Sequence, residues 1–82
     1  MYKILLTKRV LKDLGKLDTS IKERIGDKLK VLMEDPFTNI KKLSNTSIGT
    51  YRIRIGDYRV IYDIDQDNIV ILRIGHRKDI YK

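Results

Sequence analysis

Arginine alternates with apolar residues in one short stretch of the sequence, Tyr51-Arg52-Ile53-Arg54-Ile55. A period of two is typical of a β-strand, because successive side chains of a strand point to opposite faces of the sheet. Gly56-Asp57 then has the composition of a two-residue turn, and Tyr58-Arg59-Val60-Ile61-Tyr62 repeats the alternation. The stretch therefore predicts a β-hairpin, one face of which carries Arg52, Arg54 and Arg59.

The predicted turn also fixes which residues of the hairpin lie opposite one another. A two-residue turn pairs Ile55 with Tyr58 and places Arg54 opposite Arg59. Like charges that face each other in a sheet are destabilising, by up to about 1 kcal/mol. A merely solvated outer face remains an alternative, but three such arginines together favour a polyanion site. We expect these arginines to be exposed, so that replacing them leaves the fold intact.

The composition agrees with a polyanion as partner. Eighteen Lys and Arg residues against eleven Asp and Glu give a net charge of +7. Such a balance favours nucleic acid, an anionic membrane or an acidic protein. The absence of cysteine excludes a disulfide framework, a thiolate zinc site and a cysteine nucleophile, and a single histidine argues against a structural metal. We therefore expect no metal and no cofactor.

The last part of the chain predicts a further strand over residues 69–74, after a turn at Asp65-Gln66-Asp67-Asn68. The expected core residues of this strand are Val70, Leu72 and Ile74, which would place Arg73 on the face that carries Arg59. This assignment of residues to the two faces of the strand requires a bulge or an irregular loop. A symmetric turn at Gln66-Asp67 would instead place Ile69 and Ile71 on the core face.

The segment Gly75-His76-Arg77-Lys78-Asp79-Ile80-Tyr81 leaves this strand and should stay near the same sheet. His76 is the only histidine, and its unperturbed pKa is the one nearest to neutrality in this sequence. Two interpretations stay open for it, a structural histidine and a residue that transfers protons.

Two helices precede the hairpin and should cover its apolar face. A first strand over residues 2–6 is followed by Thr7 as the expected cap of a helix with Val10, Leu11, Leu14 and Leu17 at helical spacing. Ser20-Ile21-Lys22-Glu23 fits a capping box at the start of the second helix. The apolar stripe of that helix is Ile21, Ile25, Leu29, Leu32 and Met33, and Asp35-Pro36 ends it.

The element order is thus β-α-α-β-β-β, with a short strand near residues 40–43. It predicts an α+β fold, a single domain over residues 1–82 in which a two-helix hairpin packs on one face of a mostly antiparallel sheet. The longest apolar run, Ile69-Val70-Ile71-Leu72, is far shorter than the roughly 20 residues that span a bilayer. Residues 1–9 lack the features of a signal peptide, so we expect a cytoplasmic protein without a membrane partner.

With these elements in place, residues 49–62 and 74–81 resemble the RelE toxins of the RelE/ParE superfamily of type II toxin–antitoxin systems. The resemblance rests on the alternating arginines, the Tyr58-Arg59-Val60-Ile61-Tyr62 strand and the Gly-His-Arg-Lys-Asp-Ile-Tyr ending. It implies a RelE-like fold and a ribosome-dependent endoribonuclease that cleaves mRNA in the decoding site. The 2′-hydroxyl of the substrate would be the nucleophile, without metal. The implied partners are the ribosome, mRNA and a cognate acidic, RelB-like antitoxin.

The resemblance also implies roles for individual residues. Arg52 and Arg54 stand where other members have lysines, and Arg59 matches the phosphate-binding arginine of the family. Arg77 and Tyr81 match a basic residue and a tyrosine near the C-terminus. Together with His76, Arg73 and Lys78, which the residues themselves suggest, the predicted catalytic set is Arg52, Arg54, Arg59, His76, Arg77 and Tyr81. The predicted RNA-binding set is Arg52, Arg54, Arg59, Arg73, Arg77 and Lys78.

The arginines at the lysine positions leave the mechanism open. Arginine stays protonated, so Arg52 and Arg54 are poor general bases. Either electrostatic stabilisation of the transition state suffices, or His76 or Tyr81 moves protons. Two other functions also stay open: a ParE-like inhibitor of DNA gyrase, and a catalytically inactive RNA-binding relative.

Overall fold

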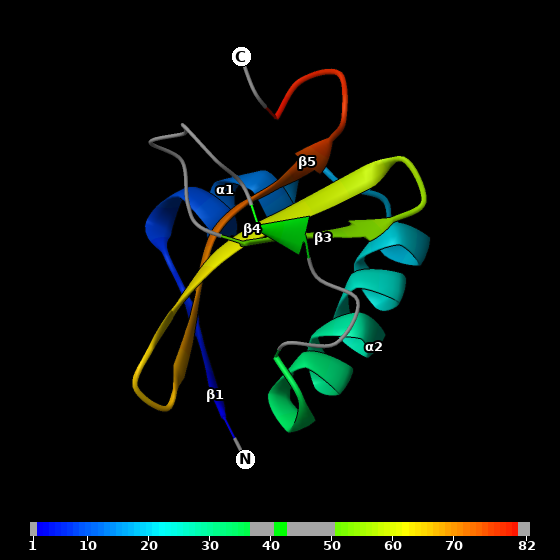
Figure 1. Cartoon of the computed structure of the whole chain (residues 1–82). Helices are drawn as coiled ribbons and strands as arrows, with labels where there is room; N and C mark the ends of the chain where they lie inside the picture. Colours follow the sequence, from blue (N-terminus) through cyan, green and yellow to red (C-terminus); the bar gives the residue numbers. More distant parts are fainter. Residues whose placement is uncertain (1, 37–40, 43–50, 81–82) are drawn as a thin grey trace.

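The computed structural model describes residues 2–36, 41–42 and 51–80 of the chain. Its elements follow the predicted order and form one sheet of strand order β1-β5-β4-β3-β2 with two helices (Figure 1). The elements are β1 (Lys3–Leu6), α1 (Lys8–Gly15), α2 (Thr19–Glu34), β2 (Lys41–Lys42), β3 (Tyr51–Ile55), β4 (Tyr58–Asp65) and β5 (Asn68–His76). The predicted α+β class is confirmed, and so is the short strand expected near residues 40–43.

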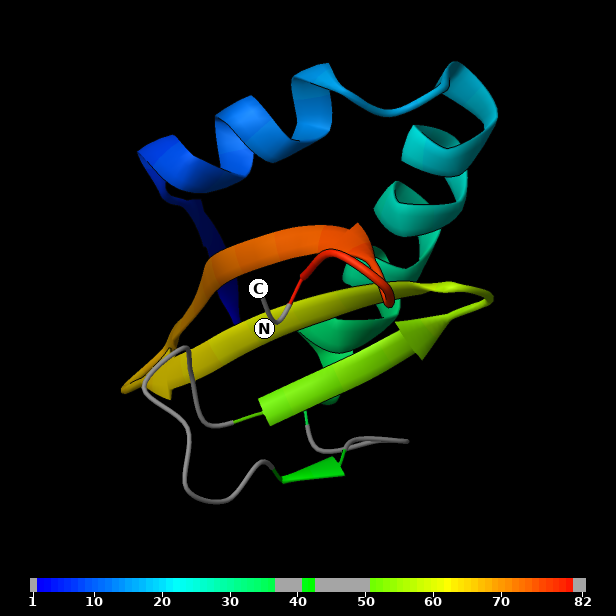
Figure 2. The ribbon, with the colours of Figure 1, turned by 90° about the horizontal axis from the view of Figure 1, so that it is seen from above.

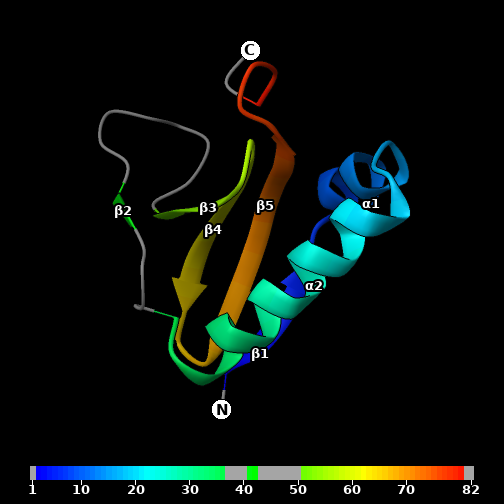
Figure 3. The same cartoon turned by 90° about the vertical axis from the view of Figure 1, so that its right-hand side faces the viewer.

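The sheet is mostly antiparallel, as predicted. Among the strands that the structure describes, β1 and β5 are the only parallel pair, and the other three pairs are antiparallel. Both helices lie on the same face of the sheet (Figure 3). The helical hairpin is an open one, since α1 and α2 meet at a corner (Figure 2). Helix α1 packs mainly on β5, and α2 reaches β1 and β3.

Helix α1 begins at the predicted cap. The Thr7 hydroxyl accepts a hydrogen bond from the Val10 amide (3.3 Å) and donates one to the Ile71 carbonyl (3.0 Å). One side chain therefore satisfies an orphan amide of the helix and ties its start to β5. Of the apolar residues at helical spacing, Val10 is fully buried, whereas Leu11 is 57% exposed and lies outside the core.

Helix α2 begins without the predicted capping box. Its cap residue is Asp18, which makes no side-chain cap hydrogen bond, and Ser20 already lies inside the helix. The prediction of a capping box at Ser20 is therefore wrong, because a cap residue needs a non-helical backbone and Ser20 has a helical one. The rest of the prediction is confirmed. Ile25 and Leu32 are buried, and the helix ends where Asp35 takes an extended conformation before Pro36.

The β3–β4 hairpin has the predicted register, with Ile55 opposite Tyr58 and Arg54 opposite Arg59. Its predicted apolar face supplies Ile53, Ile55, Val60 and Tyr62 to the core beneath the helices. The Tyr62 hydroxyl donates to the Pro36 carbonyl (2.9 Å), and burial raises the pKa of this phenol. The face that carries the arginines is less open than expected, because Ile61 is fully buried there.

The phase of β5 differs in part from the prediction. Ile69 and Ile71 are fully buried with Ile74, whereas Val70 and Leu72 are only half-buried. The register shifts between Ile61, which pairs with Arg73, and Tyr62, which pairs with Ile71. The expected irregularity is thus a bulge at Leu72 within the strand, and the turn at Gln66-Asp67 is symmetric. Choosing Val70 and Leu72 for the core was wrong, but Arg73 does share its face with Ile61.

No helix in the described part of the chain is long and apolar enough to span a membrane.

Candidate functional site

Arg59 lies at the end of the sheet where β3 turns into β4. Its Nη1 atom donates to the Gly56 carbonyl and to the Tyr58 carbonyl, both at 2.9 Å. Gly56 has φ +60°, a conformation that glycine adopts without strain, and the turn so formed directs its carbonyl at the guanidinium. Arg59 is only 8% exposed, which corrects the expectation that its side chain is solvated and dispensable for the fold.

The inward position of the Arg59 side chain explains how Arg54 and Arg59 can lie opposite each other in the sheet despite their like charges. Arg54 is exposed, while the Arg59 charge is turned back toward the carbonyls of its own turn. Carbonyl dipoles stabilise a cation without carrying a net charge of their own. The two side chains therefore leave a net charge of +2 at this end of the arginine face.

Arg77 reaches the same turn from the end of β5. Its backbone amide donates to the Asp57 carbonyl (2.8 Å), and its Nε lies 3.7 Å from an Asp57 carboxylate oxygen. Both side chains are more than half exposed, so this pair is weak and leaves the guanidinium accessible. The structure thus brings Arg54, Arg59 and Arg77 to one turn, which we name the turn cluster.

The remaining predicted residues lie around this cluster. Arg52 is half-buried further along β3, where it pairs with Ile61 of β4. Lys78 is exposed in the turn after β5, and Ile80 of that turn is fully buried beside Gly75. Tyr81 falls outside the described residues.

His76 is on the other face of the sheet. It pairs with Tyr58, and the two rings meet edge to face with their centroids 5.4 Å apart. Its Nδ1 accepts a hydrogen bond from the Lys78 amide (3.1 Å). A ring nitrogen that accepts an amide hydrogen carries no hydrogen itself, so the neutral ring that makes this bond has its hydrogen on Nε2.

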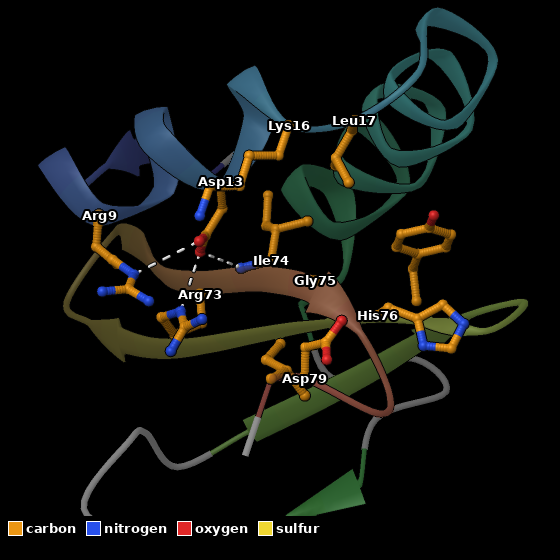
Figure 4. Close-up of a pocket in the computed structure, with 11 residues that line it drawn as sticks. Arg9, Asp13, Lys16, Leu17, Arg73, Ile74, Gly75, His76 and Asp79 are labelled. Carbon is orange, nitrogen blue, oxygen red and sulfur yellow. Dashed lines mark hydrogen bonds and ion pairs between the residues drawn. The ribbon is translucent and has the colours of Figure 1, made fainter. Parts of the chain in front are cut away.

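Sequence reasoning missed Asp13, a buried carboxylate of α1. Its Oδ2 accepts from the Ile74 amide and from Arg73 Nε, both at 3.0 Å, and its Oδ1 lies 3.5 Å from Arg9 Nε (Figure 4). Its partners on β5 are about sixty residues away in sequence, so no local pattern indicates them. The carboxylate satisfies a β5 amide beyond the last residue that pairs with β1.

Three arginines gathered at one end of the sheet in a small α+β fold are chemically suited to bind a phosphate or another anion. The sequence model of the family described as ParE toxin of type II toxin–antitoxin system, parDE, matches residues 4–81. The chain belongs to the RelE/ParE family of type II toxins.

Curated relatives carry RelE-type names. The chain is 35% identical over 88 residues to toxin RelG of Mycobacterium tuberculosis, covering 99% of this chain and 97% of RelG. It is 34% identical over 83 residues to toxin RelE3 of Methanocaldococcus jannaschii, covering 96% of this chain and 94% of RelE3.

Several similar solved structures are toxin–antitoxin complexes. The RelBE2 complex of M. tuberculosis matches with a TM-score of 0.83 and 33% identity, over 93% of this chain and 98% of the matched chain. The intact RelBE complex of Escherichia coli matches with a TM-score of 0.76 and 27% identity, over 93% of this chain and 96% of the matched chain. The predicted RelE-like fold and the predicted family are therefore confirmed.

Proposed function

We propose that this toxin is a ribosome-dependent endoribonuclease, an mRNA interferase that cuts mRNA in the decoding site and so inhibits translation. The observation that carries the proposal is the turn cluster, in which the buried Arg59 is fixed by two carbonyls beside the accessible Arg54 and Arg77. The relatives with RelE-type names support it.

The proposed chemistry is attack of the substrate's 2′-hydroxyl on the adjacent phosphate. The bond to the 5′-oxygen breaks, which leaves a 2′,3′-cyclic phosphate and a 5′-hydroxyl. Negative charge accumulates on the non-bridging oxygens in the transition state. Cations that are already in position stabilise this charge without reorganisation, which is worth about 3 kcal/mol or more for a single donor.

In this proposal Arg59 and Arg77 bind the scissile phosphate, and Arg52 and Arg54 hold the RNA strand along β3. Arg73 and Lys78 extend the basic surface toward the end of β5. A proton must leave the 2′-hydroxyl and another must reach the 5′-oxygen, and we assign Tyr81 to this transfer by family resemblance. His76 faces away from the turn cluster, so its contribution is to hold the segment that carries Arg77.

Primer extension on mRNA after induced expression tests the proposal. Cuts at codon-related positions are expected for the parent toxin and for Lys30→Ala, which removes an exposed charge on α2. They should be absent for Arg77→Ala at equal expression of folded protein. Intact mRNA with continued translation would contradict the proposal.

A ParE-like inhibitor of DNA gyrase is the second candidate, because the family model that matches residues 4–81 is named for ParE. Measuring gyrase supercoiling in the presence of the purified toxin separates the two. Halted supercoiling without mRNA cuts would support the second candidate, and neither effect would support a catalytically inactive RNA-binding relative.

The proposed partner in the resting cell is a RelB-like acidic antitoxin, since similar structures are complexes with RelB antitoxins. Its carboxylates would oppose Arg52, Arg54, Arg59 and Arg77. Charge complementarity mainly raises the association rate, and salt screens it. The association rate of the purified toxin and antitoxin should therefore fall as ionic strength rises. A rate that does not change with salt would show that the antitoxin does not bind the arginine face.

A further inference from the structure

A cavity of about 410 Å³ lies between α1 and the end of β5, and none of the three turn-cluster arginines lines it. Three basic side chains line it, Arg9 of α1, Lys16 directly after α1 and Arg73 of β5, together with the aromatic pair Tyr58 and His76. Figure 4 shows the buried Asp13 carboxylate between the two arginines, and both ion pairs are drawn there. The cavity has the size of a small-ligand site.

Asp13 holds both arginines in a way that leaves their ends available. Each guanidinium meets the carboxylate through Nε, Arg73 at 3.0 Å and Arg9 at 3.5 Å. The terminal nitrogens of these two arginines make no further hydrogen bond or ion pair with the residues that the structure describes. A guanidinium oriented through Nε presents its planar Nη donors to an anion, and phosphate oxygens fit this geometry.

The charge balance of the cavity favours an anion at this end. Arg9, Arg73 and Lys16 contribute three positive charges, and Asp13 removes one. A second acid, Asp79, also lines the cavity, but Figure 4 places it further along β5, toward His76. Helix α1 carries no other acid, and its exposed charges are Lys8, Arg9 and Lys12, with Lys16 directly after its end.

We propose that Arg9 and Arg73, oriented by Asp13, form a second phosphate site, which binds an RNA phosphate outside the scissile position. The inference rests on the proposed function, because it takes RNA as the substrate. A second phosphate contact would fix the RNA strand relative to the turn cluster and would add binding free energy remote from the reacting bond.

Equilibrium binding of a fluorescent single-stranded RNA oligonucleotide to the purified toxin, without ribosomes, tests this site directly. Arg9→Gln should weaken binding by roughly five- to tenfold, as expected for one lost phosphate contact. The slope of log affinity against log salt should fall by about 0.7. Lys12→Gln is the matched control, since it removes one exposed charge from the same helix but lies outside the cavity.

Arg73→Gln should show the same loss, although it also leaves Asp13 with one cation fewer and so requires a check of folding by circular dichroism. Arg9→Gln avoids this problem with folding, because the Arg9 side chain is 58% exposed and does not belong to the core. Equal affinities and slopes for Arg9→Gln and Lys12→Gln would overturn the inference. Perturbation of the Arg9 and Arg73 Nε resonances by inorganic phosphate with no change in RNA affinity would overturn it as well.

Because this measurement involves no cleavage, it is independent of the proposed reaction. If the toxin binds RNA through Arg9 but cuts no mRNA, the second phosphate site is supported and the proposed function is contradicted. If the toxin cuts mRNA and Arg9→Gln binds RNA with unchanged affinity, the proposed function is supported and the second phosphate site is contradicted.

Discussion

The two groups of arginines in this toxin are held by different partners. In the turn cluster, Arg59 donates to two backbone carbonyls. In the cavity, Arg9 and Arg73 share the carboxylate of Asp13. A carbonyl dipole stabilises a cation without adding a negative charge, whereas the Asp13 carboxylate cancels one of two charges.

This difference suits the two groups to different tasks. A reacting phosphate gains negative charge, so it is stabilised best by cations whose charge is not already neutralised. A site that only anchors an RNA phosphate needs less positive charge, but its donors must be well oriented. An arginine whose guanidinium is oriented by a carboxylate meets this need. Arg59 is buried and donates to two carbonyls of its own turn, so a change at this residue affects both function and stability.

The largest effect is expected for Arg59→Ala. Cleavage should fall by about 100-fold or more, because a preorganised cation is lost from the transition state. The free energy of unfolding should also fall, by about 1–3 kcal/mol, because two hydrogen bonds of a buried charged group disappear. Urea denaturation gives the stability, and cleavage is compared per folded molecule. A variant as toxic as the parent on equal expression would remove Arg59 from the site.

Arg77→Ala should reduce cleavage to a similar extent but leave stability nearly unchanged. Its side chain is 56% exposed and meets Asp57 only at 3.7 Å, and exposed pairs of this kind contribute about 0–1 kcal/mol. Asp57→Ala is the control, because it breaks the same ion pair and keeps the cation. If both variants lost cleavage equally, Arg77 would act through the turn and not through the phosphate.

Asp13→Ala should have the reverse signature, a loss of stability with a smaller effect on cleavage per folded molecule. The buried Ile74 amide would lose its acceptor and Arg73 its partner, at a cost of about 2–4 kcal/mol. Asp27→Ala removes an exposed acid from α2 and should change stability by less than about 0.5 kcal/mol. Similar midpoints of urea denaturation for these two variants would show that Asp13 does not hold α1 on β5.

The sequence predicted the hairpin well, because Gly56-Asp57 selects the turn and a clean period of two fixes every pair. It did not predict the phase of β5, since Ile69-Val70-Ile71-Leu72 is apolar at every position and both phases satisfy the core equally. Nor did any local pattern indicate that Arg59 turns inward or that Asp13 reaches Ile74. Those contacts depend on tertiary structure, which places α1 beside β5.

The smallest effect is expected for His76→Gln, a change at a residue that lines the cavity and directly precedes Arg77 in the chain. General acid or base catalysis by this side chain would make the loss about 100-fold or more. We expect less than about threefold, because Nδ1 is engaged by the Lys78 amide and the ring lies with Tyr58 on the face opposite Arg59. The glutamine side chain has an oxygen that can accept the same amide. Cleavage rates of parent and variant, measured at saturating ribosomes, decide between these outcomes. A hundredfold loss would show that His76 is a catalytic residue and would contradict its assignment to the face opposite the catalytic arginines.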